Sequence, residues 1–276
     1  MTTTVAPTAP SAAPAFVASG SGLSFAGLLR SEWIKLRTVR STIWSYATVI
    51  VISLGLALLM SSTLDLQGSM QVTEPEQTSW MIQVSTFGII FGQLVVAVLG
   101  VLSISGEYST GMVRSSLTAA PRRLPVLAAK AIVLFVCTYI VGLISIVGSY
   151  LVATPTMAGK GISASLADPD LFLPLMSAAL YLSLVAVFSL GLGTILRSSA
   201  GGIAAALGVI LLLPTVLQLI PADWVADMMP YILSNAGTDS FVMSGTMEPW
   251  QNILIVLGWV AVSLAGAAVL LKRRDA

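Results

Sequence analysis

Long uncharged hydrophobic stretches dominate the pattern of this chain. Six stretches contain no Asp, Glu, Lys or Arg, and they cover residues 43–62, 82–105, 131–153, 174–196, 201–220 and 252–271. A helix needs about 20 apolar residues to cross the hydrocarbon of a bilayer, and its backbone polar groups are then paired within the segment. The stretches lack the alternation of a membrane barrel strand. The pattern therefore predicts an all-α membrane protein with six transmembrane helices.

The residues before the first span differ from the spans in composition. Residues 1–22 are mainly Thr, Ala, Pro and Ser, which is typical of a disordered tail. Residues 23–42 have a helical period, with one apolar face formed by Phe25, Leu28, Leu29, Trp33, Leu36 and Val39. We expect an amphipathic elbow helix that lies in the membrane interface, with its tryptophan at headgroup depth.

Glu32 interrupts the apolar face of this predicted elbow helix. It could bend out of that face and pair with Lys35, one turn further on. Alternatively, it could reach a cytoplasmic partner. The residue pattern leaves both alternatives open.

Charge is distributed unevenly between the two sides of the six predicted spans. If the chain crosses six times, 12 of the 13 basic residues lie on one side, and Lys160 alone lies on the other with nine of the 12 acidic residues. Basic residues favour the cytoplasmic side. We therefore expect both termini in the cytoplasm and the chain in the cytoplasmic membrane. The basic residues of that side are Arg30, Lys35, Arg37, Arg40, Arg114, Arg122, Arg123, Lys130, Arg197, Lys272, Arg273 and Arg274.

Composition agrees with a membrane protein and disfavours several functions. Hydrophobic residues make up 56% of the chain, charged residues 9%, and the mean hydropathy is +0.94. The net charge of +1 gives no basic field for nucleic acid. There is no histidine and only one cysteine, which disfavours Ser-His catalysis and the common zinc motifs. We expect no enzyme activity, no metal site and no cofactor site on this chain.

The internal loop at 106–130 begins with the motif "SGEYSTGMVR". If residues 106–117 are helical, Glu107, Gly111 and Arg114 share one face, because each residue turns the helix by about 100°. A glutamate suits a helix N-terminus, and a glycine lets another backbone or side chain approach closely. The alternative is a solvated ion pair that only marks topology, worth under about 1 kcal/mol.

The segment "SGEYSTGMVRSSLTAAPRR" resembles the one that follows the second span of type-2 ABC exporter permeases. The segment "LLRSEWIKLRTVRSTIW" is similar to the start of those proteins, and the six-span order covers residues 23–274. The resemblance implies two permease subunits, identical or related, each docked on an ABC-type ATP-binding subunit that carries ATP and Mg. It assigns coupling to the ATPase to Glu107, Tyr108, Gly111 and Arg114, with Arg197 as a weaker candidate. The position of Glu32 makes it a further weak candidate for an interface contact.

The outer loop at 221–251 is unusually apolar, and Pro230 would break a helix there. We expect a short re-entrant pair of helices before the sixth span, or alternatively an amphipathic helix on the outer surface. Small residues at 191–193, 201–208 and 264–268 favour close helix packing over ligand binding. Gln83, Gln93 and Gln218 could face either a pathway or a neighbouring helix.

These observations favour a permease subunit of an ATP-driven exporter. The chain has no G-x-x-x-x-G-K-[ST] phosphate loop, so ATP would be hydrolysed by a separate chain. A pathway without ionisable groups suits an amphipathic or lipid-like cargo. The alternative is a multi-span immunity or scaffold protein that does not transport.

Overall fold

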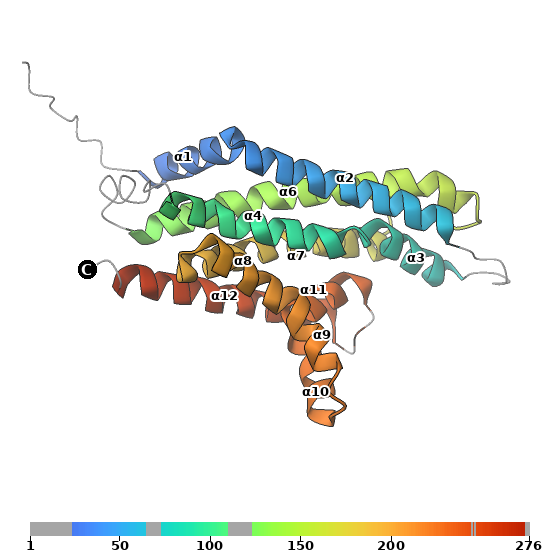
Figure 1. Ribbon diagram of the computed structural model, residues 1–276. Helices are drawn as coiled ribbons and strands as arrows, with labels where there is room; N and C mark the ends of the chain where they lie inside the picture. The colour runs from blue at the N-terminus through green and yellow to red at the C-terminus, as the bar shows by residue number, and fades with distance from the viewer. Residues whose placement is uncertain (1–23, 65–72, 110–122, 244, 246, 274–276) are drawn as a thin grey trace, which may run out of the picture.

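Most of the long helical segments lie side by side along one axis, and Ser199–Gln218 turns away from them (Figure 1). The computed structural model describes residues 24–64, 73–109, 123–243, 245 and 247–273, and every regular element in these ranges is a helix. Six segments of the described chain are long and apolar enough to cross a membrane. The predicted all-α class and the number of spans are therefore confirmed. The segments are Arg40–Thr63, Glu74–Tyr108, Leu124–Ala158, Pro169–Leu196, Ser199–Gln218 and Pro249–Arg273.

Two helices meet at an angle at the start of the described chain. Helix α1 covers Phe25–Thr38 and α2 covers Arg40–Thr63, with extended backbone at Val39 between them. The Ser24 side chain accepts a hydrogen bond from the Gly27 N–H, 3.1 Å away, which caps α1. The expected helix before the first span is present. Its location in the membrane interface stays a prediction.

The second span is broken, whereas the sequence pattern predicts one continuous helix. Helix α3 (Glu74–Thr86) is followed by a turn and then by α4 (Ile89–Ser109). The turn contains Gly88, which lies directly against α2: a Cβ added there would come within 2.4 Å of the Ser53 Cα. Only glycine permits this close approach.

Helix α7 (Pro169–Leu196) is the centre of the bundle. Of its most apolar stretch of 18 residues, 78% is buried inside the molecule, which is the largest share among the six segments. Helices α4, α6 (Arg123–Ala158) and α12 (Pro249–Arg273) pack around it. Added Cβ atoms would come within 2.6 Å of the Ser263 Oγ at Gly191 and within 2.9 Å of Ile104 at Gly193. The predicted packing role of these small residues is therefore confirmed.

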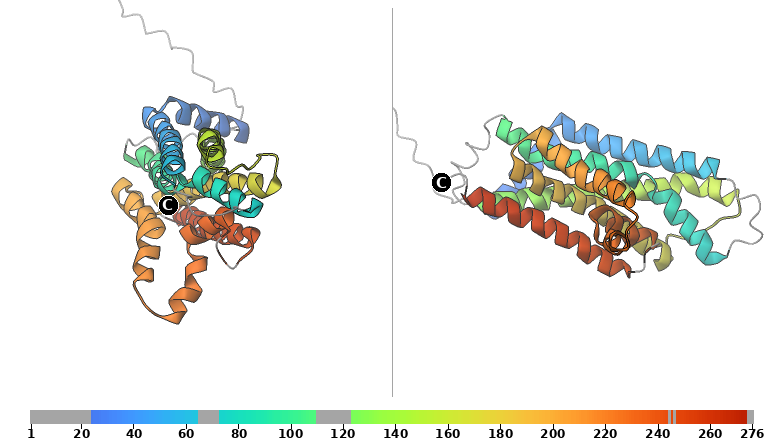
Figure 2. Two further views of the ribbon diagram at one scale, coloured as in Figure 1. Left: turned by 90° about the vertical axis from the view of Figure 1, so that its right-hand side faces the viewer. Right: turned by 60° about the horizontal axis from the view of Figure 1, so that its bottom comes forward.

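The fifth span contains a π-helical turn and leaves the bundle. It consists of α8 (Ser199–Leu207), the π-helix η1 (Gly208–Leu212) and α9 (Leu213–Gln218). Pro214 has no N–H, and its ring would clash with the carbonyl four residues earlier in a regular helix, so a π turn before it relieves this conflict. Helix α9 then projects away from the other helices (Figures 1 and 2).

The loop at 221–251 forms two short helices. Helix α10 (Asp223–Met228) lies at the projecting tip, the 3₁₀ turn η2 (Met229–Tyr231) contains Pro230, and α11 (Leu233–Val242) returns to the bundle (Figure 2). On α11, a Cβ added at Gly237 would come within 1.9 Å of the ring of Tyr181 in α7, so α11 packs directly against α7 there. The re-entrant position of this pair in a membrane stays a prediction.

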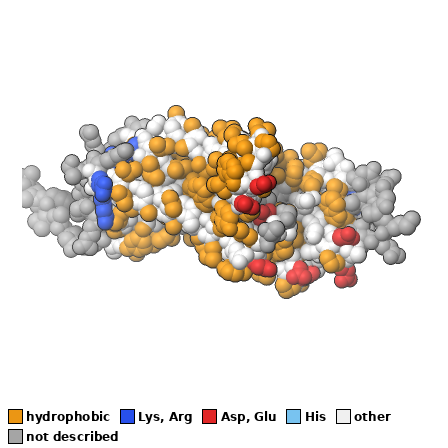
Figure 3. Space-filling model, turned by 90° about the horizontal axis from the view of Figure 1, so that it is seen from below, with side chains coloured by type: hydrophobic (Ala, Val, Ile, Leu, Met, Phe, Trp, Pro, Cys, Tyr) orange, Lys and Arg blue, Asp and Glu red, His pale blue; other side chains and the backbone are white. Residues whose placement is uncertain are grey.

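Charge is divided along the long axis. In Figure 3 the visible Lys and Arg side chains lie mainly at one end, and Asp and Glu lie from the middle toward the other. Lys160 is the cation that the sequence places with the acids, and it has a structural contact there. Its Nζ donates to the Ser61 and Ser62 carbonyls, at 2.7 Å and 3.1 Å, in the last turn of α2. A cation is favourable at such a helix C-terminus.

Candidate functional site

Four charged side chains from three helices meet at the end of the bundle where α1 begins. They are Glu32 and Lys35 of α1, Glu107 of α4 and Lys130 of α6, and we call them the ion cluster. Helix α4 ends at Ser109, before residues 110–122, and α6 begins at Arg123, after them. The cluster therefore joins the first helix to both sides of the predicted coupling loop.

Lys130 is the centre of the ion cluster. Its Nζ lies 2.6 Å from Glu32 Oε2 and 2.8 Å from Glu107 Oε1, and it also donates to the Ser103 carbonyl at 3.2 Å. These contacts use all three ammonium donors. Only 4% of Lys130 is exposed, so the charge relies on these partners and not on water.

Lys35 completes the ion cluster from its partly exposed side. Its Nζ lies 2.7 Å from Glu32 Oε1 and 2.9 Å from Glu107 Oε1. Partial burial opposes the charged form, but the hydrogen bonds to the two carboxylates outweigh this and raise the pKa of Lys35 above its ordinary value. The ammonium therefore stays charged at physiological pH.

The structure confirms one part of the first interpretation of Glu32 and corrects another. Its pairing with Lys35 is present, but the side chain does not bend outward, because only 3% of Glu32 is exposed. Its second oxygen binds Lys130, from a helix 98 residues further along the chain. The arrangement is therefore a buried cluster and not a solvated pair, and a contact of Glu32 with an external partner stays a prediction. The signal in the sequence was the position of Glu32 on an otherwise apolar face.

The structure also corrects the position of Glu107. We expected it at the start of a separate short helix, but it lies in the C-terminal part of the continuous helix α4. The predicted loop at 106–130 is narrower, since residues 106–109 belong to α4 and residues 123–130 to α6. Lys130, which sequence reasoning used only as a topology marker, is a member of the site. Gly111 and Arg114 lie outside the described residues.

Tyr108 and Arg197 form a second contact close to the ion cluster. The guanidinium carbon of Arg197 lies 5.3 Å from the centre of the Tyr108 ring, within the range of a cation–π interaction. Arg197 ends α7 in the left-handed conformation, with φ at 51°. Nearby, the Ser199 and Ser105 hydroxyls are 2.9 Å apart. The last turn of α4 is thus tied to the turn between α7 and α8.

A cavity of about 390 Å³ adjoins the ion cluster below the elbow of α1 and α2. All four charged residues of the cluster line it, together with apolar side chains of α1, α4 and α6. No group of three or more His, Cys, Asp or Glu side chains gathers as metal ligands would in the part of the chain that the structure describes. The site thus consists of an ion cluster between three helices and a largely apolar cavity beside it.

Comparison with known protein families shows which family the chain belongs to. The model of the ABC-2 family transporter proteins matches residues 27–276. The chain belongs to this family. No curated protein matches the chain. The family match covers the ion cluster and all six candidate spans, and it confirms the resemblance to type-2 ABC permeases. This ABC-2 protein is a membrane permease component of a transporter, and its family implies association with an ABC ATP-binding subunit.

Proposed function

We propose that this ABC-2 protein is the permease subunit of an ATP-driven exporter in the cytoplasmic membrane. It moves an amphipathic or lipid-like cargo, while a separate subunit binds ATP and Mg and hydrolyses the nucleotide. A second permease, identical or related, completes the membrane part. The observation that carries the proposal is the ion cluster in a chain of this family. The cluster contains one residue before the segment 110–122 and one residue after it.

The ion cluster supports a mechanical role for residues 110–122. Glu107 precedes this segment and Lys130 follows it, and the two side chains are 2.8 Å apart. Both also bind residues of α1. Separating buried charged partners is costly, because each would be left without compensation in a low-dielectric surrounding. A subunit that pushes on residues 110–122 would therefore move α4, α6 and α1 together.

The Tyr108–Arg197 contact extends this connection toward the centre of the bundle. Tyr108 follows Glu107 on α4, and Arg197 ends the central helix α7. Movement of the last turn of α4 would thus also reach α7 and the turn that starts α8. In this proposal Glu107 and Tyr108 distribute the force, and Gly111 and Arg114 contact the ATPase itself.

The division of charge supports an orientation with both termini in the cytoplasm. The last turn of α12 contains Lys272 and Arg273 and lies at the end of the bundle where α1 begins and the ion cluster lies (Figure 1). A basic end favours the cytoplasmic side, where an ATPase has access to nucleotide. The export direction and the nature of the cargo are part of the same proposal.

The first experiment isolates the complex from its native membrane in a mild detergent. We expect an ABC-type ATPase and a second permease, identical or related, to copurify with the chain. A non-transporting immunity or scaffold protein would be isolated without an ATPase, and that result would refute the proposed function.

A second experiment tests the coupling residues in the purified complex reconstituted into vesicles. Gly111→Trp should leave insertion and copurification intact and lower ATP turnover, because a bulky side chain would block close approach at the interface. Arg30→Ala, which removes an exposed cation of α1, is the matched control and should behave like the wild type. Equal turnover in Gly111→Trp and the wild type would remove this position from the mechanism.

A further inference from the structure

The cavity below the elbow has the form of a site for an amphipathic molecule. Its volume of about 390 Å³ lies within the range of roughly 300–1,000 Å³ found for small-molecule sites. Leu36, Leu99 and Leu134 form apolar wall, and the ion cluster occupies one end. Two further wall residues, Val39 and Leu102, are 46% and 37% exposed, so the cavity is open on their side.

The charged end of the cavity offers a hydrogen-bond donor at Lys35. Lys130 uses all three of its donors, whereas Lys35 uses two of three within the described residues, and its side chain is 29% exposed. The two carboxylates already accept from the lysines. The remaining donor therefore suits an anionic group.

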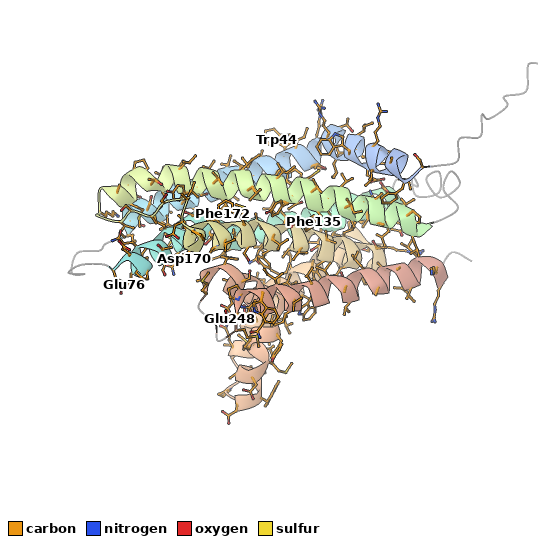
Figure 4. The ribbon with its side chains drawn as sticks, turned by 180° about the vertical axis from the view of Figure 1, so that it is seen from behind. Trp44, Glu76, Phe135, Asp170, Phe172 and Glu248 are labelled. Carbon is orange, nitrogen blue, oxygen red and sulfur yellow. The ribbon has the colours of Figure 1, made fainter. Side chains whose placement is uncertain are left out.

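The nearest charges to Lys35 are the carboxylates of Glu32 and Glu107, and the charged side chains of α1 and α2 outside the ion cluster are all cations. Arg37 and Arg40 are exposed on the same elbow, and the hydroxyl residues Ser41 and Thr42 also line the cavity. Trp44, on the first turns of α2, is 72% exposed and projects outward (Figure 4). Basic and aromatic residues beside an apolar surface are typical of proteins that contact lipid headgroups.

We propose that the cavity binds one anionic phospholipid of the inner leaflet. An acyl chain lies along the leucine-lined wall, and the phosphate accepts a hydrogen bond from Lys35. The lipid then fills the space between α1 and the bundle and becomes part of the surface against which α1 packs. The inner leaflet as the source rests on the orientation in the proposed function.

Two substitutions separate the apolar and charged parts of this site. Gly106 lines the cavity, and no heavy atom lies within 4 Å of where its Cβ would be, so Gly106→Leu should fill the cavity without a clash. Gly258→Leu on α12 is the matched control, because that glycine is exposed and equally open. Lys35→Gln removes the charge and keeps an apolar stem.

The experiment is native mass spectrometry of the chain released from vesicles of equal parts phosphatidylglycerol and phosphatidylcholine. We expect one retained phosphatidylglycerol in the wild type and in Gly258→Leu, and loss of this lipid in Gly106→Leu. Lys35→Gln should reduce the preference for phosphatidylglycerol by about fivefold, the effect of one cation near an anionic headgroup.

Three results would overturn the proposal. Equal lipid retention in Gly106→Leu and the wild type would exclude the cavity, and equal retention of the two lipids by the wild type would exclude an anionic headgroup. Displacement of the lipid by an excess of inorganic phosphate would show a phosphate site without an acyl chain. The measurement needs neither ATPase nor cargo, so absence of an ATPase from the native complex would refute the exporter and leave this result standing.

Discussion

The ion cluster and the projecting segment α9–α10 place their side chains in opposite surroundings. In the cluster, buried charges are matched within the chain. On the projecting segment, large apolar side chains face outward, with Leu219 78% and Trp224 54% exposed. Charges inside a membrane protein have to be paired, whereas apolar side chains are equally compatible with lipid or protein. The buried charges of the cluster are thus paired within the chain, whereas the exposed side chains of α9–α10 are compatible with lipid or with a protein surface.

The largest effect should come from breaking the ion cluster at its centre. Lys130→Met removes the lysine that pairs with both buried carboxylates, Glu32 and Glu107, and we expect a loss of about 3–5 kcal/mol in the free energy of unfolding. Denaturant unfolding in detergent micelles measures this change. Arg30→Met, on the exposed face of α1, is the control. A loss in Lys130→Met no larger than in the control would mean that the cluster does not hold these helices.

The next effect concerns α11, the buried neighbour of the projecting segment. Gly237→Leu would force a side chain into the Tyr181 ring, and overpacking of this kind costs about 1–3 kcal/mol. Ala226→Leu, on the exposed surface of α10, should leave the free energy of unfolding almost unchanged. The same unfolding assay compares the two variants. Similar losses in both would show that α10 packs as tightly as α11.

A smaller effect is expected for the cation at the opposite end. Lys160→Met removes hydrogen bonds to the carbonyls at the end of α2, which we expect to cost about 1–2 kcal/mol. The loss should be local, so hydrogen exchange should increase in the last turn of α2 and not in α1. Faster exchange spread over the whole bundle would contradict a local capping role.

Removing apolar surface from the projecting segment should change the stability of the single chain least. Leu219→Ser and Trp224→Ser replace side chains that are 78% and 54% exposed, and exposed substitutions usually stay within about 0.5 kcal/mol. If a second permease covers this surface, the same variants should weaken subunit association in detergent, measured by light scattering. A large loss of stability in the isolated chain would mean that α9–α10 packs on its own bundle.

The contribution of Lys35 to the free energy of unfolding should not depend on pH near neutrality. A raised lysine pKa contributes stability that is fully present below the ordinary value of 10.5 and is lost only as pH rises through the higher folded value. We expect a flat free energy of unfolding for this contribution between about pH 6 and about pH 9. Comparing the wild type with Lys35→Gln across this range isolates the effect. A difference that changes within the range would contradict the assigned charge state.

Sequence reasoning reached the site only in part. The motif around Glu107 and the position of Glu32 indicated functional charges, and Arg197 was named without its contact to Tyr108. Lys130 was missed as a partner because a cation beside an uncharged run is also a normal topology signal. The break at Gly88 was missed because a single glycine inside an apolar run does not reveal which helix presses against it.

The sequence by itself determined the class of the molecule, the number of its spans and the separation of its charges. These properties follow from local conditions, because bilayer thickness sets the length of each apolar run and basic residues mark one side. Only the tertiary structure decided that Glu32 meets Lys130, 98 residues away, and that α9 leaves the bundle. Such contacts depend on how helices are rotated and crossed against each other, and no single segment carries that information.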